Sequence, residues 1–264
     1  MATAIDWVQL RKNVLHATQR VDLYSPSYWN KEATVINEKL PHWSNLTKKQ
    51  LSQLPLSKEI TVLDVGAGTG RMTLPIAKRV KHVTALEPSE RMLAFLSDKA
   101  RRQQICNISY INKTLEDMDV SCSYDLVVAS FSLFMFDIKD ALLKMNTLAR
   151  KGVYLFLCAS PWVDTELQLA IYDSRSYWSD FIFIYNILHD LEIIPNVQIR
   201  IYTLKQCFMN LDDAVEKTLQ RYHIPIEKKM KLRAYLQATC VEEKGKLWYN
   251  RKRKAATIWW TKNH

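Results

Sequence analysis

Three of the five glycines in this 264-residue chain stand at alternate positions, Gly66, Gly68 and Gly70. Average composition would supply roughly 18 glycines, so a chain that otherwise avoids glycine has concentrated it here. Glycine accommodates a positive φ and lets another molecule approach the backbone closely. The apolar run Ile60–Val65 predicts a buried strand, and Met72–Val80 predicts a helix. A strand, a glycine turn and a helix in this order hold nucleotide-like ligands in doubly wound folds.

The spacing of these glycines distinguishes two classes of ligand. The dinucleotide fingerprint G-x-G-x-x-G requires a glycine at position 71, where this chain has Arg71. The pattern G-x-G-x-G, with Asp64 two residues ahead, resembles motif I of the class I S-adenosylmethionine-dependent methyltransferases. The next expected strand, His82–Glu87, ends in an acid, and the Glu87 carboxylate could accept hydrogen bonds from ribose hydroxyls. The resemblance implies S-adenosyl-L-methionine as cofactor and a small-molecule methyltransferase similar to those of ubiquinone biosynthesis.

The elements that must position this turn follow in the order that the family has, over residues 58–160. They are the helix Glu90–Arg102, the strand Ile108–Asn112, the strand Tyr124–Ser130, the helix Ile138–Ala149 and the strand Val153–Ala159. Ser89 is the expected N-cap of the first helix, and the strand that ends at Ser130 resembles motif IV. Alternating strands and helices predict a doubly wound, Rossmann-like α/β fold with a mostly parallel sheet. The resemblance implies seven strands, the last one antiparallel.

In the family, the loop after the third strand covers the adenine, often with an acid where Thr114 stands. Here the acid comes two residues later, at Glu116. The cofactor-binding residues that the resemblance implies are Asp64, Gly66, Gly68, Gly70, Glu87, Pro88, Thr114, Leu115, Glu116 and Ser130.

Two segments lie outside this core. Residues 1–57 predict an N-terminal helical lid, and residues 161–264 predict a helical cap inserted after the fifth strand, followed by the last strands of the sheet. Val197–Leu204 and Ala256–Thr261 are candidates for these strands. In the alternative, Leu247–Asn250 pairs with Ala256–Thr261 as a hairpin closed by the basic run between them.

Aromatic residues of both segments are candidates for a substrate pocket, because phenol and indole rings are amphipathic. Tyr24, Tyr28 and Trp29 belong to the lid, and core packing explains them equally well. Tyr177 and Trp178 belong to the expected cap helix Thr165–Leu191, in which an interruption near Ser174 is an alternative. Phe131 directly follows the fourth strand. Most aromatic residues at helical spacing in this cap are expected to be core.

Methyl transfer from a sulfonium is an in-line displacement that depends mainly on holding the nucleophile against the methyl carbon. The segment Phe131–Phe136, where relatives that act on phenols or amines often carry histidine, has none, so no catalytic residue is assigned. His189 is expected to be structural. An N-P-P-Y or D-P-P-Y motif is also missing, which argues against methylation of a base amino group. The alternatives are an RNA or protein methyltransferase and a regulatory protein that binds S-adenosylmethionine without catalysis.

The net charge of +10 permits a nucleic-acid partner but is weak evidence for one, because the basic run Arg251–Lys254 is expected to be a solvated turn. Five cysteines without a C-x-x-C argue against a disulfide framework and a zinc site, and no metal is expected. The N-terminus lacks the order of a signal peptide, and no run approaches about 20 apolar residues. We therefore expect a cytoplasmic protein without a membrane partner.

Overall fold

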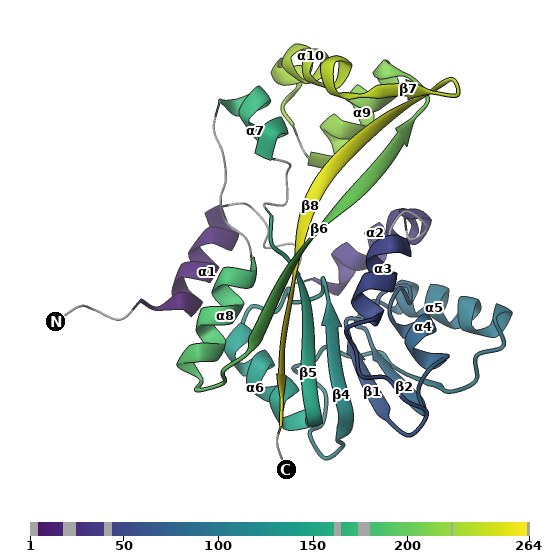
Figure 1. Ribbon diagram of the computed structural model, residues 1–264, viewed down its shortest axis with the longest axis vertical. Coiled ribbons are helices and arrows are strands. Elements are labelled where there is room, and N and C mark those ends of the chain that lie inside the picture. Colours follow the sequence, from purple (N-terminus) through teal and green to yellow (C-terminus); the bar gives the residue numbers. More distant parts are fainter. Residues whose placement is uncertain are drawn as a thin grey trace. The chain divides into compact units, whose positions relative to one another are not determined.

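The computed structural model describes residues 5–17, 25–39, 44–160, 165–173, 180–222 and 224–262. The chain divides into two compact units (Figure 1). Unit 1 consists of Met1–Leu157, Asp180–Gln198 and Ala256–His264; unit 2 consists of Cys158–Ser179 and Ile199–Ala255. These boundaries differ from the three segments expected from the sequence. Residues 1–57 form no separate unit, and residues 161–264 are divided between both units.

The sheet has the strand order β3-β2-β1-β4-β5-β8-β6. Its strands are β1 (Thr61–Val65), β2 (His82–Leu86), β3 (Ile108–Ile111), β4 (Tyr124–Ser130), β5 (Ala149–Cys158), β6 (Asn196–Phe208), β7 (Val241–Glu243) and β8 (Lys246–Thr261). Strands β1 to β5 pair in parallel. The bonds from Lys262 N to Lys151 O and from Ala159 N to Lys254 O give β8 an antiparallel register with β5. The predicted mostly parallel α/β sheet is confirmed, with β7 as an eighth strand paired to β8.

Alternate residues of the unit 1 strands enter two hydrophobic clusters, as a sheet covered on both faces requires. On β1, Val62 belongs to one cluster and Leu63 to the other. The Val62 cluster contains residues of α3 (Ser44–Leu51), α4 (Thr73–Ala77) and α5 (Glu90–Arg102). The Leu63 cluster contains α6 (Ile138–Leu148) and α8 (Asp180–Asp190), with α1 (Trp7–Ala17) packed against it. Figure 1 shows these two helix layers on opposite faces of the sheet.

The expected cap helix over residues 165–191 forms two helices that belong to different units. α7 (Thr165–Tyr172) lies in unit 2, whereas α8 lies in unit 1 and buries Phe183, Ile184, Ile187 and Leu188 in its core. The apolar side chains of α8 therefore complete the sheet packing, and the prediction that it covers the active site as part of a cap is not supported by this packing.

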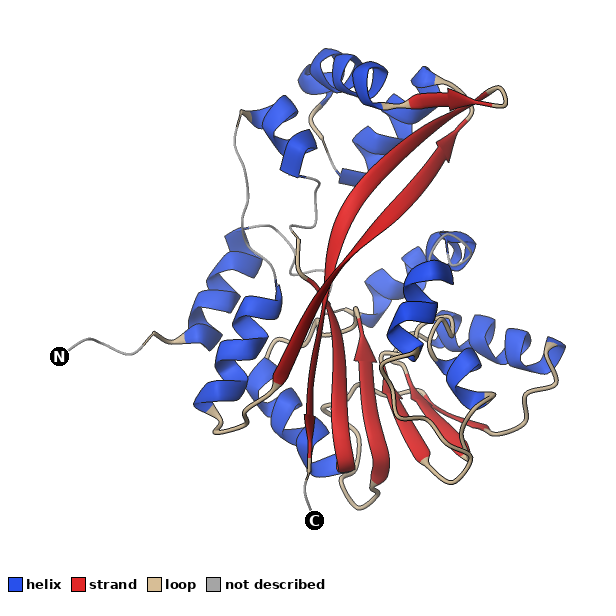
Figure 2. Cartoon of the chain, viewed as in Figure 1, coloured by secondary structure: helices blue, strands red, loops and turns tan. Residues whose placement is uncertain are grey.

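Unit 2 contains α7, α9 (Leu211–Tyr222), the 3₁₀ turn η3 (Ile226–Lys228), α10 (Lys229–Thr239) and β7. Strands β6 and β8, drawn in red in Figure 2, run through residues of both units. The hairpin proposed around the basic run is wrong, because β8 continues through it: Arg251 and Arg253 are buried, and Lys252 and Lys254 are exposed. No described helix is long and apolar enough to cross a membrane.

Candidate cofactor and active site

The three glycines of the turn after β1 are required for different reasons. All have positive φ, +69° at Gly66, +54° at Gly68 and +93° at Gly70. A Cβ at Gly66 would lie 2.4 Å from the Cβ of Ser132, and one at Gly70 would lie 2.4 Å from Leu96 Cδ1. At Gly68 the nearest heavy atom to a Cβ would be Met92 Sδ, at 3.7 Å. Packing within the protein therefore accounts for Gly66 and Gly70, whereas a Cβ at Gly68 would make only an ordinary contact with Met92.

Glu87 follows β2 and is only 5% exposed. Its Oε2 accepts a hydrogen bond from Gly68 N and its Oε1 accepts one from Ser89 N, both at 2.9 Å. Burial raises the pKa of Glu87, these two hydrogen bonds lower it, and the charge of Asp64 raises it further. A carboxylate has about four acceptor sites, so two remain for hydroxyl donors such as a ribose diol. Glu87 thus lies directly beside Gly68.

Asp64 lies within the protein below the turn, 2% exposed, where its Oδ2 accepts a 2.6 Å hydrogen bond from Thr73 Oγ1. Burial raises the pKa of Asp64 to about 6, although the Thr73 hydroxyl and the charge of Arg71 act to lower it. A ligand does not have to contact Asp64 for it to affect the site, since its charge also raises the pKa of Glu87.

The loop after β3 places the expected adenine residues in contrasting environments. Leu115 is buried, and Glu116 is exposed. Thr114 Oγ1 donates a 2.8 Å hydrogen bond to Asp117 Oδ2, which ties that hydroxyl into the loop. The Asn112 side chain holds the end of β3 against residues 87 and 88, because its Nδ2 donates hydrogen bonds to the backbone carbonyls of Glu87 and Pro88. Leu115 therefore belongs to the hydrophobic core, in the same cluster as Leu86 at the end of β2.

The end of β4 is connected to the glycine turn by Arg71. Its guanidinium donates to Ser130 Oγ, and also to Thr47 Oγ1 and Gln50 Oε1 of α3. The same guanidinium lies 5.4 Å from the ring centroid of Phe131, whose φ is +55°. Arg71 therefore joins three parts of the chain that are far apart in sequence: the turn, the N-terminal helix α3 and the segment after motif IV.

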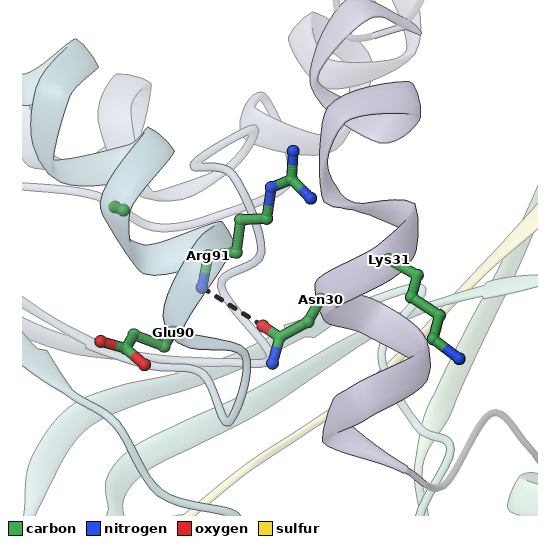
Figure 3. Close-up of a pocket in the computed structure, with 5 residues that line it drawn as sticks. Asn30, Lys31, Glu90 and Arg91 are labelled. Atoms are coloured by element: carbon green, nitrogen blue, oxygen red, sulfur yellow. Dashed lines mark hydrogen bonds between the residues drawn. The ribbon is translucent and has the colours of Figure 1, made fainter.

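The N-terminal helices contact the segments at both sides of the turn. In α2 (Pro26–Lys39), the Trp29 ring lies 5.0 Å from that of Phe134, and the Tyr28 ring packs edge-on against Trp29. Asn30 Oδ1 accepts hydrogen bonds from Ser89 Oγ at 2.6 Å and from Arg91 N at 3.3 Å. The second of these is the dashed line in Figure 3. Helix α2 thus secures the start of α5.

A pocket of about 410 Å³ lies between α2 and α5, lined by Asn30, Lys31, Glu90, Arg91 and Ala94 (Figure 3). In helix α1, the buried Arg11 side chain donates hydrogen bonds to the backbone carbonyls of Leu133 and Met135, in the segment that follows β4. These contacts join α1 to the segment after β4 and α2 to the start of α5. Among the described residues, no group of His, Cys, Asp or Glu side chains could hold a metal ion.

Sequence reasoning treated Arg71 only as the residue that breaks a dinucleotide fingerprint, and it did not identify Asn30 or Ser132. Ser132 Oγ donates to Val65 O, so it holds the end of β1 against the segment after β4. A signal was present for Arg71 alone, because a cation directly after a glycine turn is close to any ligand there. Tyr24, Tyr177 and Trp178 lie outside the described residues.

Comparisons with known proteins agree with this geometry. Residues 62–152 match the family described as a methyltransferase domain. An uncharacterized protein of Haemophilus influenzae is 27% identical over 207 residues, covering 77% of this chain and 76% of that protein. A 23S rRNA (uracil-C5)-methyltransferase of Aliivibrio fischeri is 35% identical over 72 residues, which are 27% of this chain but only 16% of that protein.

Two solved structures share the fold. The YcgJ protein of Bacillus subtilis has a TM-score of 0.57 and 15% identity, over 83% of this chain and 98% of that one. A candidate methyltransferase of Bacillus halodurans has a TM-score of 0.56 and 17% identity, over 83% and 99% of the two chains. Fold and site together define the class I S-adenosylmethionine-dependent methyltransferases. The match over residues 62–152 identifies a methyltransferase domain in this chain, and proteins of this class use S-adenosylmethionine as their cofactor.

Proposed function

We propose that this enzyme transfers the methyl group of S-adenosylmethionine to a small molecule, and that positioning supplies most of the catalysis. The observation that carries the proposal is the room beside Gly68, where a Cβ would meet only Met92 Sδ at 3.7 Å, next to the buried Glu87 carboxylate. Close to it runs the segment Phe131–Phe136, which has no side chain that titrates near neutral pH. The arrangement suits a reaction in which alignment, and not proton transfer, limits the rate.

The residues present fit the cofactor. Glu87 would accept hydrogen bonds from the two ribose hydroxyls with the acceptor sites that Gly68 N and Ser89 N leave. The backbone of Gly68 would lie against the cofactor. Asp64, Gly66 and Gly70 would shape the turn without direct contact. When bound, the cofactor supplies an electrophilic methyl group on a sulfonium.

The protein's own residues would hold the acceptor and exclude water. Arg11 holds the segment after β4 through the carbonyls of Leu133 and Met135, and Trp29 packs against Phe134. These contacts hold the apolar segment Phe131–Phe136 in place. Such a segment offers no proton acceptor, so it suits a nucleophile that arrives unprotonated. His189 is exposed in the last turn of α8.

Two observations favour a small molecule over RNA. The pocket between α2 and α5, lined by Asn30 and Glu90 among others, has a volume of about 410 Å³, within the roughly 300–1,000 Å³ typical of small-ligand sites. The densest basic run of the chain, Arg251–Lys254, turns two of its four side chains inward, so it offers phosphates a smaller charged surface than its sequence suggests. The rRNA methyltransferase match does not extend over the parts of that enzyme outside this domain.

Product analysis with methyl-labelled S-adenosylmethionine tests the proposal. The purified protein would be incubated in parallel with a low-mass metabolite extract, total RNA and a protein extract. We expect label in the low-mass fraction only. Label in RNA or protein, with none in the low-mass fraction, would refute the proposed substrate class.

Gly68→Val provides the inactive control, because its side chain would occupy the room beside Gly68. Gly245→Val is the matched variant: Gly245 lies in the turn between β7 and β8 with a similar φ of +69° and no atom within 4 Å of a Cβ. Both substitutions impose the same backbone strain. Only Gly68→Val should abolish cofactor binding by calorimetry; equal affinity in the two variants would move the site elsewhere.

A further inference from the structure

One side of the long strands in unit 2 is covered by helices. Along β8, Tyr249, Arg251 and Arg253 are buried, and Tyr249 belongs to the same hydrophobic cluster as residues of α7, α9 and α10. Tyr202 of β6 is buried as well and is hydrogen-bonded to Arg253. Because successive residues of a strand point to opposite sides of the sheet, the remaining residues of β6 and β8 point away from these helices.

The side away from the helices is exposed and carries lysines. Lys252 and Lys254 alternate with the buried arginines along β8, and Lys205 is exposed on β6. Ile199 and Ile201, on the same side of β6 as Lys205, are 46% and 59% exposed. We call this side the ribbon face; its members include Ile199, Ile201, Lys205, Val241, Lys252 and Lys254.

Strand β7 extends the ribbon face. Its Val241 is paired with Trp248 of β8, and directly paired residues lie on the same side of a sheet. Strand alternation places the half-buried Trp248 on the same side as Lys252, and Val241 is 50% exposed. The pair of Glu243 and Lys246 also lies on this side, where the two charges offset each other. The face thus combines lysines with exposed aliphatic side chains.

The charge of unit 2 has the same sign as the face. Residues 158–179 and 199–255 contain 15 Lys and Arg against 9 Asp and Glu. Two of the arginines, Arg251 and Arg253, lie directly beneath the face on the covered side of β8, so they add to its positive potential. The surface that complements this face is therefore anionic.

We propose that the ribbon face docks on the surface of a lipid bilayer that contains anionic lipids. Lysines near such a surface are attracted by its negative potential, and their aliphatic stems lie along the apolar boundary while the ammonium groups stay in water. Ile199, Ile201 and Val241 would enter the boundary between headgroups and acyl chains, as apolar side chains of interfacial elements do.

The aliphatic side chains favour a membrane over a nucleic acid. Proteins bind single-stranded nucleic acids largely through aromatic rings on which the bases stack, and isoleucine and valine have no such ring. The sequence predicts no membrane partner because it contains no long apolar run, but docking on a surface does not require one. The proposal stands on unit 2 alone and does not depend on the methyl-transfer activity.

Co-sedimentation of the full-length protein with vesicles tests the proposal. The vesicles consist of phosphatidylcholine alone or of an equal mixture of phosphatidylcholine and phosphatidylglycerol, at physiological ionic strength. Each lysine close to an anionic membrane contributes about fivefold in affinity. We therefore expect the protein to bind the mixed vesicles at least about tenfold more tightly than the phosphatidylcholine vesicles.

The double variant Lys252→Gln/Lys254→Gln should weaken binding to the mixed vesicles about tenfold or more. The matched control, Lys48→Gln/Lys49→Gln, removes the same charge from exposed residues of α3 in unit 1 and should change the binding less than about twofold. Ile201→Thr keeps a β-branched residue on the strand and should weaken the binding about threefold or more. That loss should persist at high salt, because it is not electrostatic.

Thermal unfolding of each variant shows whether its fold is intact. No preference of the wild type for the mixed vesicles, or equal losses in the two lysine double variants, would overturn the proposal. A fluorescent uridine oligonucleotide is titrated in parallel. Tight binding of this oligonucleotide that Lys252→Gln/Lys254→Gln loses, together with no binding to the mixed vesicles, would show that the face recognises nucleic acid instead.

Discussion

Replacing Asp64 with asparagine should stabilise the ligand-free protein at neutral pH. Burial raises the pKa of Asp64 from 3.8 to about 6 in the folded protein. Because the folded-state pKa lies above the unfolded value, the folded protein binds the proton more tightly. The contribution of this carboxyl group to stability is therefore fully present below about pH 3.8 and is lost as the pH rises through about 6. Above that, a buried negative charge remains.

The size of the effect follows from the pKa. One pKa unit corresponds to about 1.36 kcal/mol, so the change from 3.8 to about 6 corresponds to about 3 kcal/mol at pH 8. Asparagine has the same shape, and its carbonyl oxygen can still accept the hydrogen bond from Thr73 Oγ1. We expect about 1–3 kcal/mol of stabilisation, which for a chain of this size raises the melting temperature by several degrees, at about 2–4 °C per kcal/mol.

Urea unfolding between pH 4 and pH 8 measures this difference, since the midpoint reports stability while the slope reports the exposed surface. The variant's advantage should be small near pH 4, grow up to about pH 6 and then stay constant. Asp64→Asn that is less stable than the wild type by the same amount at every pH would refute the reasoning, because the carboxylate would then not be a net cost.

Asp125→Asn is the control with the opposite sign. Burial by itself would raise the pKa of Asp125, but hydrogen bonds from Thr61, Lys151 and Arg150 together hold that pKa well below its usual range. A lowered pKa gives stability that is present above the unfolded value and lost as the pH falls. Asp125→Asn should therefore be less stable than the wild type near pH 7, by about 1.5 kcal/mol or more, and this deficit should shrink in acid.

Glu87→Ala should weaken S-adenosylmethionine binding about tenfold or more by calorimetry, and a change below about twofold would place the ribose elsewhere. Gly66→Ala should destabilise the fold by about 1–3 kcal/mol, because its Cβ would meet Ser132 at 2.4 Å; an unchanged melting temperature would contradict that contact. Arg11→Met should lower stability by about 2 kcal/mol by leaving two carbonyls without donors, whereas Lys12→Met should cost less than about 1 kcal/mol; equal losses would argue against the Arg11 contacts. His189→Ala should leave turnover within about twofold, and a loss of a hundredfold or more with an intact circular dichroism spectrum would reveal a base.

The cofactor half of the fold could be predicted because its signals are local. The helix Glu90–Arg102 and its N-cap Ser89 are confirmed residue for residue, with Ser89 Oγ accepting a hydrogen bond from Met92 N. The glycine turn could also be predicted, because glycine is the residue type that adopts a positive φ most readily. Which glycine leaves room for a Cβ depends on Ser132 and Leu96, which are distant in sequence, and it required the structure.

The second half could not be predicted because its partners are distant in sequence. The run from Phe181 to Leu188 indicates a buried helix, but nothing in it shows that α8 packs in unit 1 while the preceding α7 belongs to unit 2. The sequence of the basic run predicts a solvated turn, because arginine is rarely buried. Its burial depends on tyrosines such as Tyr222, 29 residues away along the chain from Arg251.

Arg71 shows how one residue can exclude a ligand by sequence and support another by structure. Replacing the last glycine of a dinucleotide fingerprint, it brings a positive charge close to Asp64, where it lowers the pKa of a carboxyl group that burial raises. Asp64 in turn raises the pKa of Glu87. The charge of Arg71 therefore favours ionised Asp64, and ionised Asp64 opposes the ionisation of Glu87, the group proposed to accept the ribose hydroxyls. Its hydrogen bonds to Ser130 and α3 fix the guanidinium in this place, so the electrostatics of the turn depend on helices that the cofactor motif itself does not include.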